Sequence, residues 1–145
     1  MHENPEFDLH DFLPYLLNQA SEASSLQFQR LYRDRYGMLR SEWRVLFHLG
    51  IYGPMTAREI CDQARMHKTK ISRAVQKLGE RRFLNRTRSF TDKRVEHLNL
   101  TTAGRAAYRD LLAVAADYDR QLTAGLSDQE ALLLRRMLRR LAGLP

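Results

Sequence analysis

Apolar residues recur at helical spacing in six segments of the chain, with a stretch of different pattern between the fourth and the fifth. A repeat of three or four residues places apolar side chains on one face of a helix, whereas alternation favours a half-buried strand. The spacing predicts helices at about 11–36, 42–49, 56–64, 67–81, 102–122 and 129–141. Between 83 and 100 a loose alternation predicts two strands joined by a polar tip at 89–93. The pattern therefore predicts a mainly α chain with a small β-hairpin.

Residues that favour helix ends support three of these segments. Thr56 and Glu59 have the spacing of a capping box, as do Ser127 and Glu130. Ser41 is a good N-cap for the helix at 42–49, which Gly50 is expected to close. Thr56 is also a candidate phosphate contact, because it lies at a helix start.

The order of elements from 41 to 101 is that of a winged helix-turn-helix DNA-binding domain. The helix at 67–81 has an apolar back, and its other face carries side chains that can bond to base edges or phosphates. The candidate recognition residues are Lys68, Thr69, Lys70, Ser72, Arg73, Gln76 and Lys77. A solvated surface helix would show the same division, so the basic hairpin that follows is what favours DNA binding.

The hairpin carries four basic side chains around its polar tip. The candidate wing residues are Arg86, Arg88, Lys93 and Arg94. Such an arm can reach phosphates or place an arginine in the minor groove. Asp92 is an acid at a DNA-facing tip, and it is interpreted either as positioning Arg94 or an adjacent amide, or as a simple turn former.

The distribution of charge supports a polyanionic partner. The chain has 145 residues, 43% of them hydrophobic, which suits about one globular domain. Its net charge is +7 and its pI about 10.0. Twelve Lys/Arg and five Asp/Glu lie between 56 and 101, whereas acids and bases cancel elsewhere. The whole excess of positive charge therefore lies in the predicted DNA-binding stretch.

The flanking helices at 1–36 and 102–145 are predicted to form a helical dimerisation region, with 41–101 as the DNA-binding domain. The first helix has more apolar positions than one face needs, and Leu26 and Phe28 are among them. Wrapping around the chain's own core is the alternative explanation for this breadth.

Several short motifs together resemble one known family. They are Leu78, Leu84, Asp-Lys-Arg at 92–94, Leu-Thr-Thr-Ala-Gly at 100–104 and Trp-Arg-Val-Leu at 43–46. This combination resembles the MarR family of bacterial transcriptional regulators, over essentially the whole chain. One departure is Arg82, which stands where the family usually has glycine before the wing strand, so the conformation of that helix end is an open question.

The resemblance implies an obligate homodimer that reads a pseudo-palindromic operator in double-stranded DNA. It also implies that a small, often aromatic and acidic ligand binds between the dimerisation and DNA-binding parts and shifts the spacing of the recognition helices. Candidate lining residues are Phe12, Tyr15, Trp43, Arg44, Phe47 and Tyr108. The same aromatic residues could instead be ordinary core.

Other chemistry finds little support in the sequence. The sequence has a single cysteine, Cys61, so no intrachain disulfide can form. Cys61 is expected to be structural, with redox sensing as the alternative. The histidines do not have the spacing of metal ligands. The sequence contains neither a recognisable group of catalytic residues nor a glycine-rich phosphate loop. No metal site, cofactor or enzymatic activity is therefore predicted. No apolar run is long enough to span a membrane, and a cytoplasmic location is expected.

The sequence thus favours a ligand-responsive, homodimeric repressor. The alternatives are a non-specific nucleoid or RNA-binding module that uses the same basic face, and an enzyme or interaction module built on the same scaffold.

Overall fold

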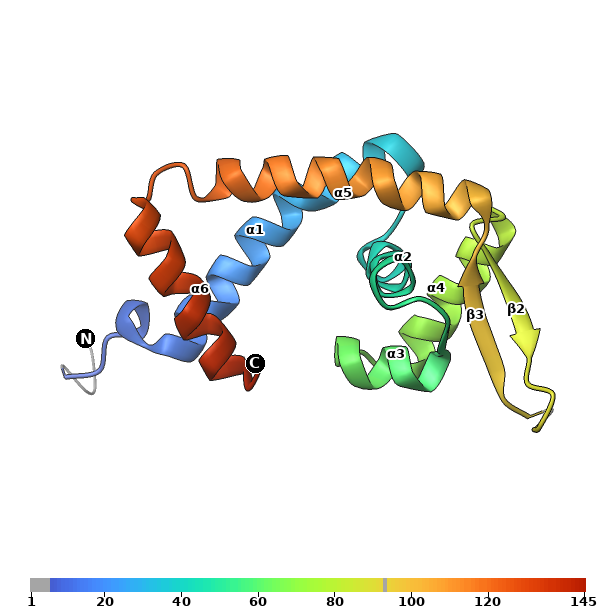
Figure 1. Ribbon diagram of the computed structural model, residues 1–145. Coiled ribbons are helices and arrows are strands. Elements are labelled where there is room, and N and C mark those ends of the chain that lie inside the picture. Colours follow the sequence, from blue (N-terminus) through green and yellow to red (C-terminus); the bar gives the residue numbers. More distant parts are fainter. Residues whose placement is uncertain (1–5, 93) are drawn as a thin grey trace. The chain divides into compact units, whose positions relative to one another are not determined.

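The structure is a computed structural model that describes residues 6–92 and 94–145 (Figure 1). Its elements are a 3-10 helix at Leu9–Asp11, α1 Leu13–Tyr36, α2 Arg40–Tyr52, β1 Met55–Thr56, α3 Ala57–Ala64, α4 Lys68–Glu80, β2 Leu84–Arg88, β3 Glu96–Leu100, α5 Thr102–Leu122 and α6 Asp128–Ala142. The mainly α fold with a small β-wing is confirmed. Contacts divide the chain into two compact units, Met1–Leu112 and Ala113–Pro145.

The predicted ends of the second helix were wrong. Helix α2 begins at Arg40 and runs past Gly50 to Tyr52. The Glu42 carboxylate accepts a hydrogen bond from the Leu39 amide at 2.7 Å, so the start is satisfied from the first turn without Ser41. Gly50 lies inside the helix, where the Tyr108 ring occupies the place of a side chain, and an added Cβ would lie 2.5 Å from a ring carbon.

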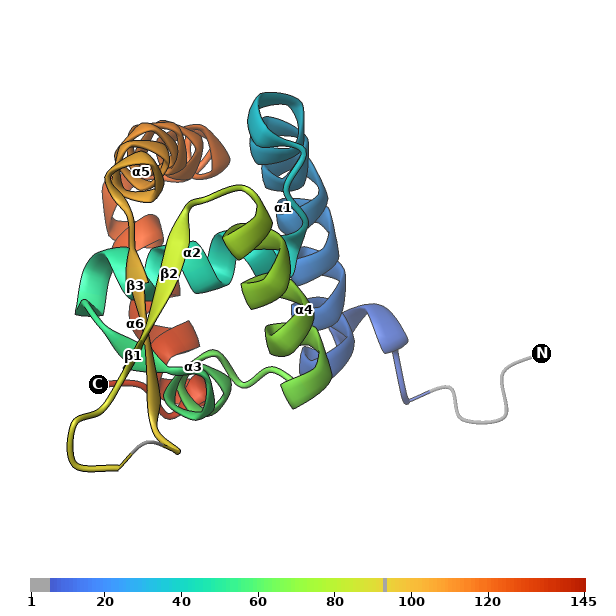
Figure 2. The ribbon, with the colours of Figure 1, turned by 90° about the vertical axis from the view of Figure 1, so that its right-hand side faces the viewer.

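The sheet contains one strand that the sequence pattern did not predict. Its order is β1-β3-β2, and both pairings are antiparallel. Figure 2 shows β3 between β1 and β2, beside α3 and α4. Strand β1 is two residues long, Met55 facing Leu98 and Thr56 facing His97. Two residues are too few to show a period, so β1 could not be found from alternation.

The core of the first unit lies between α2, α3, α4 and the sheet. Helix α4 packs against α2 and α3. The buried hydrophobic residues are Tyr32, Met38, Val45, Leu46, Leu49, Met55, Ile60, Ile71, Ala74, Val75, Leu78, Leu84, Leu98, Ala107 and Leu111. This core holds α4 through its apolar face, Ile71, Ala74, Val75 and Leu78.

The end of α4 settles the conformation at Arg82. This residue has φ 61°, in the left-handed region that glycine adopts most easily. The Phe83 amide donates to the Leu78 carbonyl at 2.9 Å, and the Arg82 amide donates to the Gly79 carbonyl at 3.0 Å. These are the two bonds of a Schellman motif, so the chain turns here as it would with glycine.

The second unit contains the end of α5 and all of α6. The capping box at its start is confirmed, because Ser127 Oγ accepts from the Glu130 amide at 3.1 Å and Glu130 Oε1 accepts from the Ser127 amide at 2.9 Å. Helix α6 buries none of its residues in the single chain. Among the described residues, no helix is long and apolar enough to cross a membrane.

Candidate nucleic-acid interface

The turn between α3 and α4 is built from local hydrogen bonds. Thr56 Oγ accepts from the Glu59 amide at 3.1 Å, which caps α3. Arg65 ends α3 with φ 53°, in the left-handed region. His67 Nδ1 then accepts from the Thr69 amide at 3.1 Å and caps α4. These caps fix the start of α4 at Lys68, which is the first of the candidate recognition residues.

Helix α4 divides as its sequence pattern predicts. Ile71, Ala74, Val75 and Leu78 are buried. All seven candidate recognition residues are exposed. An exposed row of cationic, hydroxyl and amide side chains on a rigidly packed helix can donate to guanine, pair with adenine and contact phosphates.

A groove of about 460 Å³ brings four of the predicted residues together. It lies between the start of α3, helix α4 and the hairpin. Its lining residues are Thr56, Ala57, Arg58, Ser72, Val75, Arg86, Arg94, Val95, Glu96 and Leu98. Arg58 was not among the predicted site residues. Its position could have indicated it, because it is a basic residue in the first turn of α3, the first helix of the helix-turn-helix.

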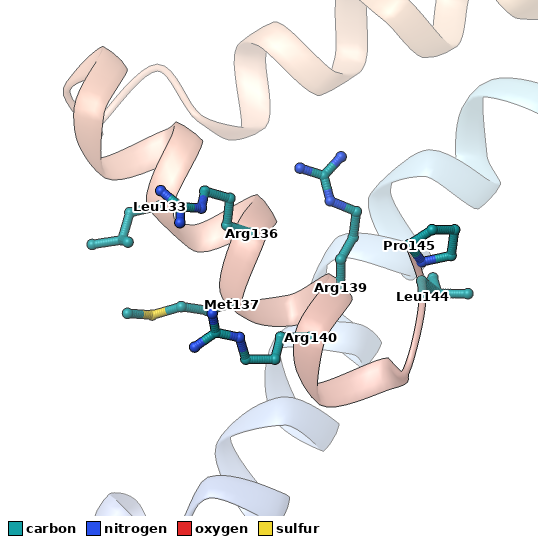
Figure 3. A pocket seen from close by; sticks show the side chains of 7 residues that line it. All are labelled: Leu133, Arg136, Met137, Arg139, Arg140, Leu144 and Pro145. Atoms are coloured by element: carbon teal, nitrogen blue, oxygen red, sulfur yellow. The ribbon is translucent and has the colours of Figure 1, made fainter.

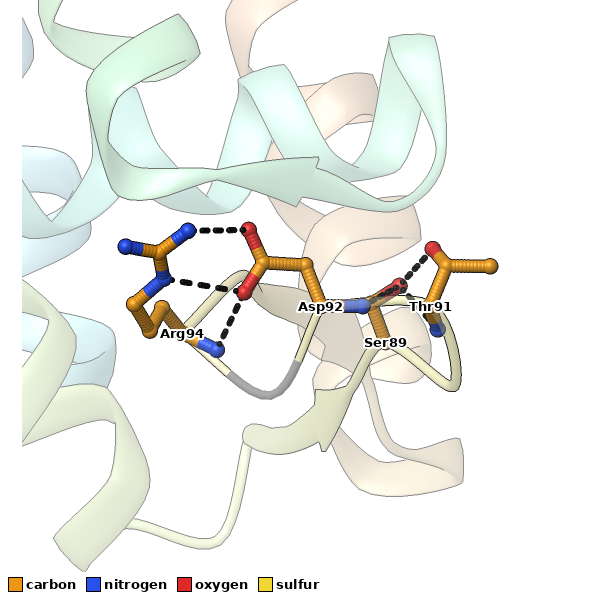
Figure 4. A network of polar contacts seen from close by, with 4 residues as sticks. All are labelled: Ser89, Thr91, Asp92 and Arg94. Carbon is orange, nitrogen blue, oxygen red and sulfur yellow. Dashed lines mark hydrogen bonds and ion pairs between the residues drawn. The ribbon is translucent and has the colours of Figure 1, made fainter.

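The wing tip is organised around Asp92 (Figure 4). Asp92 Oδ1 accepts from the Arg94 amide at 3.0 Å and from Arg94 Nε at 3.1 Å. These bonds from Arg94 hold the pKa of the Asp92 carboxyl below its ordinary value. Ser89 Oγ completes the turn by accepting from the Thr91 amide at 3.2 Å. The carboxylate therefore orients Arg94 and shapes the turn at once, while the Arg94 side chain stays 92% exposed.

The other wing residues differ in their partners. Arg86 lies 3.6 Å from Glu96 across the strand pair, whereas Arg88 is exposed at the end of β2. Lys93 lies outside the described residues. The wing therefore presents Arg88 and Arg94 near its tip and Arg86 in the middle of β2.

The predicted ligand-pocket residues lie in separate contacts. The Trp43 and Phe47 rings are 5.0 Å apart, and the Phe47 and Tyr108 rings are 5.4 Å apart. Phe12 instead packs on Phe7, and Tyr15 on His10. The structure thus brings three of the six together in one aromatic cluster, with Arg44 on the same helix as Trp43.

A polar corner adjoins this aromatic cluster, and the sequence did not point to it. The Tyr32 ring packs 6.0 Å from the Trp43 ring, and Tyr32 is only 1% exposed. Its hydroxyl has no hydrogen-bond partner in the described part of the chain. Burial raises the pKa of Tyr32, which nearby Arg40 opposes. Burial, and then the charge of Arg40, lowers the pKa of Arg44. A buried hydroxyl beside two mutually repelling cations is suited to an anion.

Other chemistry has less structural support. Cys61 is partly buried and packs against the core from α3. Within residues 6–92 and 94–145 no group of three His, Cys, Asp or Glu side chains could hold a metal ion.

Helix α6 carries a second basic surface, which lies outside the winged domain. Arg136, Arg139 and Arg140 project from the helix near Met137 and Leu133 (Figure 3). Arg135 instead pairs with Asp119 at 2.9 Å. The apolar side chains that α6 exposes are Leu132, Leu133, Leu134, Met137, Leu138 and Leu141.

A family model and a solved structure both show similarity to the MarR family. The model of the MarR family matches residues 36–95. A solved MarR family transcriptional regulator from Silicibacter pomeroyi is 30% identical, with a TM-score of 0.82 over 95% of this chain and 98% of that one.

Two further solved structures share the fold at lower identity. A mutant of MarR from E. coli, solved with operator DNA, is 20% identical, with a TM-score of 0.79 over 89% of this chain and 92% of that one. The regulator BpsR of Bordetella bronchiseptica, whose DNA binding is regulated by 6-hydroxynicotinic acid, is 20% identical, with a TM-score of 0.82 over 90% of this chain and 98% of that one.

Proposed function

Because the chain belongs to the MarR family of DNA-binding transcriptional regulators, we propose that it is a cytoplasmic homodimeric repressor of a pseudo-palindromic operator. The observation that carries this proposal is the groove in which Thr56, Ser72 and Arg94 meet beside the exposed face of α4. It combines base-reading side chains with arginines that can hold the backbone, and sequence-specific binding needs both.

The dimer is proposed from the apolar surface of the terminal helices at 1–36 and 102–145. Six large apolar side chains on α6 are exposed in the single chain. Exposed large apolar side chains gathered on one helix mark an interaction surface. A second copy is the occupant proposed here, because a two-fold dimer presents two α4 helices to two half-sites.

Paired duplexes test this proposal. A duplex selected by the protein from a random pool is titrated against random duplex of equal length at matched salt. The selected duplex is expected to bind at least about 1,000-fold more tightly. Equal affinities would reject the repressor and favour the non-specific nucleic-acid-binding alternative.

A double substitution tests the site assignment. Arg73→Ala with Arg94→Ala is expected to weaken operator binding by about 2–6 kcal/mol, if each arginine contributes about 1–3 kcal/mol. Arg33→Ala with Arg120→Ala removes the same charge from exposed positions outside the winged domain and serves as the control. Intact binding in the Arg73/Arg94 variant would contradict the assignment.

The ligand response is proposed at the polar corner of Tyr32, Arg40 and Arg44 beside Trp43. A carboxylate there would give the buried Tyr32 hydroxyl an acceptor and relieve the repulsion between the arginines, while a ring would meet the aromatic cluster. A ligand changes DNA affinity only if it binds with different affinity to two conformations of the dimer, which differ in the spacing of the two α4 helices.

Thermal shift measurements test the ligand site with defined probes. 6-Hydroxynicotinic acid and benzoate are compared with benzamide, which lacks the carboxylate. Acids that bind the native state raise Tm, and Arg44→Met is expected to abolish the shift. Equal shifts with benzamide, or an undiminished shift in the variant, would contradict the assignment.

A further inference from the structure

One side chain, Arg81, holds the C-terminal end of the recognition helix. Its Nε donates to Glu42 Oε1 at 3.0 Å, its Nη1 to the Tyr36 carbonyl at 2.5 Å and its Nη2 to the Gly37 carbonyl at 3.0 Å. The guanidinium thus joins the end of α4 to the last turn of α1 and the first turn of α2. Because its N–H groups form a rigid planar fork, three such bonds fix orientation as well as distance.

The Glu42 carboxylate needs the cation of Arg81 because it is buried. Glu42 is 0% exposed. Its second oxygen, Oε2, accepts from the Leu39 amide at 2.7 Å, so both oxygens are used. A buried carboxylate that loses its cation is strongly unfavourable. Helix α4 therefore cannot swing away from α2 without stranding the buried Glu42 carboxylate, nor from the end of α1 without losing two hydrogen bonds.

The same joint reaches helix α5. The Tyr36 hydroxyl donates to Asp110 Oδ2 at 2.8 Å, and Arg35 Nη1 donates to Asp110 Oδ1 at 3.0 Å. Burial, and then the bond to Asp110, raises the pKa of Tyr36. Tyr36 thus meets Arg81 through its carbonyl and α5 through its hydroxyl. The recognition helix is therefore tied by polar contacts to α1 and α5, both of which contribute to the proposed dimerisation region.

We propose that Arg81 is a positioning residue for operator recognition. It sets the angle of α4 relative to the helices that carry the dimer, and it acts through Glu42 and the α1 carbonyls without contacting DNA. Hydrogen bonds to base edges require accurate placement, whereas phosphate contacts tolerate small rotations. Arg81 therefore governs discrimination between operator and other DNA more than binding strength. This inference rests on the proposed function, in which α4 reads an operator.

The test uses a variant that keeps the net charge. Arg81→Met with Glu42→Gln removes one cation and one anion, so no buried charge is stranded and long-range attraction to DNA is unchanged. The glutamine oxygen can still accept from the Leu39 amide. The measurement is the ratio of dissociation constants for random duplex and for a duplex selected from a random pool by the unsubstituted protein. The ratio is expected to fall by about tenfold or more while random-duplex affinity stays within about twofold.

Two other roles for Arg81 give different outcomes, and either would overturn the proposal. If Arg81 only stabilises the fold, partial unfolding lowers both affinities by one factor and leaves the ratio intact. If Arg81 binds a phosphate, the affinity of the variant for both duplexes depends less steeply on salt, by about one released counterion.

Two companion variants complete the experiment. Arg81→Lys keeps the cation opposite Glu42 but cannot span the acid and both carbonyls, so it is expected to fold and to lose part of the ratio. Arg33→Met, an exposed charge removal on α1, is expected to keep the ratio. Absence of any operator preference in the unsubstituted protein would reject the proposed function itself, whereas a preserved ratio in both Arg81 variants would reject this inference alone.

Discussion

Helices α4 and α6 have similar sequence patterns and opposite burial. They have 13 and 15 residues, and each combines an apolar face with several cationic side chains. Helix α4 buries four residues of its apolar face, whereas α6 buries none. An apolar face therefore predicts that a helix will be covered, but not by what. In α4 the cover is α2 and α3 of the same unit, and in α6 we propose that it is a second copy.

The largest expected effect breaks the proposed cover of α6. Leu134→Glu with Leu138→Glu would place two carboxylates in the dimer interface, each costing several kcal/mol. We expect the dimer dissociation constant to rise by more than about 1,000-fold, or ~4 kcal/mol. Sedimentation velocity over a concentration series measures it.

The control for that experiment lies on the opposite side of the same helix. Gln129→Glu with Arg136→Glu also introduces two carboxylates, and the dimer is expected to persist. A Leu134/Leu138 variant that remained dimeric at micromolar concentration would show that this face of α6 is covered by something else.

The next effect probes the buried face of α4. Leu78 is 0% exposed, so Leu78→Ala is expected to lower the free energy of unfolding by about 2–5 kcal/mol. Urea denaturation gives this value. Leu132→Ala is the matched change on α6, and in the monomeric Leu134/Leu138 variant it is expected to cost no more than ~0.5 kcal/mol, since Leu132 is 60% exposed. Equal costs at the two positions would contradict the contrast in burial.

The two helix ends provide a smaller contrast. Both turn through a left-handed residue, which is Arg82 after α4 and Gly143 after α6. A side chain in that region costs about 1–2 kcal/mol, partly offset by the greater freedom of unfolded glycine. We therefore expect Arg82→Gly to stabilise the protein by about 0.5 kcal/mol, measured by urea denaturation. Gly143→Ala is expected to have the opposite sign, and a destabilised Arg82→Gly variant would mean that the Arg82 side chain makes a stabilising contact.

The smallest expected effect concerns the start of α6. Hydrogen bonds with Ser127 hold the pKa of the Glu130 carboxyl below its ordinary value. Because the folded pKa is lowered, this cap contributes fully above the unfolded pKa and is lost as pH falls through the folded pKa. An NMR titration of the Glu130 side chain and the Ser127 amide should show one shared midpoint in the acid range. Glu130→Gln should remove the transition from the Ser127 amide, and a midpoint at the ordinary glutamate value would contradict the cap.

Features that depend on near neighbours in sequence could be predicted. Thr56 and Ser127 each accept from the amide three residues on, as expected, and at Ser127 the reciprocal bond from Glu130 completes a capping box. The apolar back of α4 and the hairpin follow from local spacing in the same way. The end of α2 was not predicted, because Gly50 lies within the helix and packs against the ring of Tyr108, a residue distant in sequence. No pattern within the helix contains that contact.

The candidate site likewise has features that were predictable from the sequence and others that were not. Sequence spacing predicted the exposed polar face of α4 and the pairing of Asp92 with Arg94 at the wing tip, because those groups lie on one helix or in one loop. Arg81 and Glu42 are 39 residues apart, and neither charge was distinguishable from any other surface charge until the fold buried Glu42.

The sequence by itself determined the order of the six helices and the hairpin, the concentration of positive charge on the winged domain and the two-faced character of α4. These properties depend on side-chain period and on total charge, both of which are local or additive. Only the tertiary structure decided which apolar faces the chain covers itself, where Tyr32 leaves a buried hydroxyl beside arginines, and how Arg81 ties α4 to α1. Those features arise from contacts between distant segments, whose energies exist only once the core has brought the segments together.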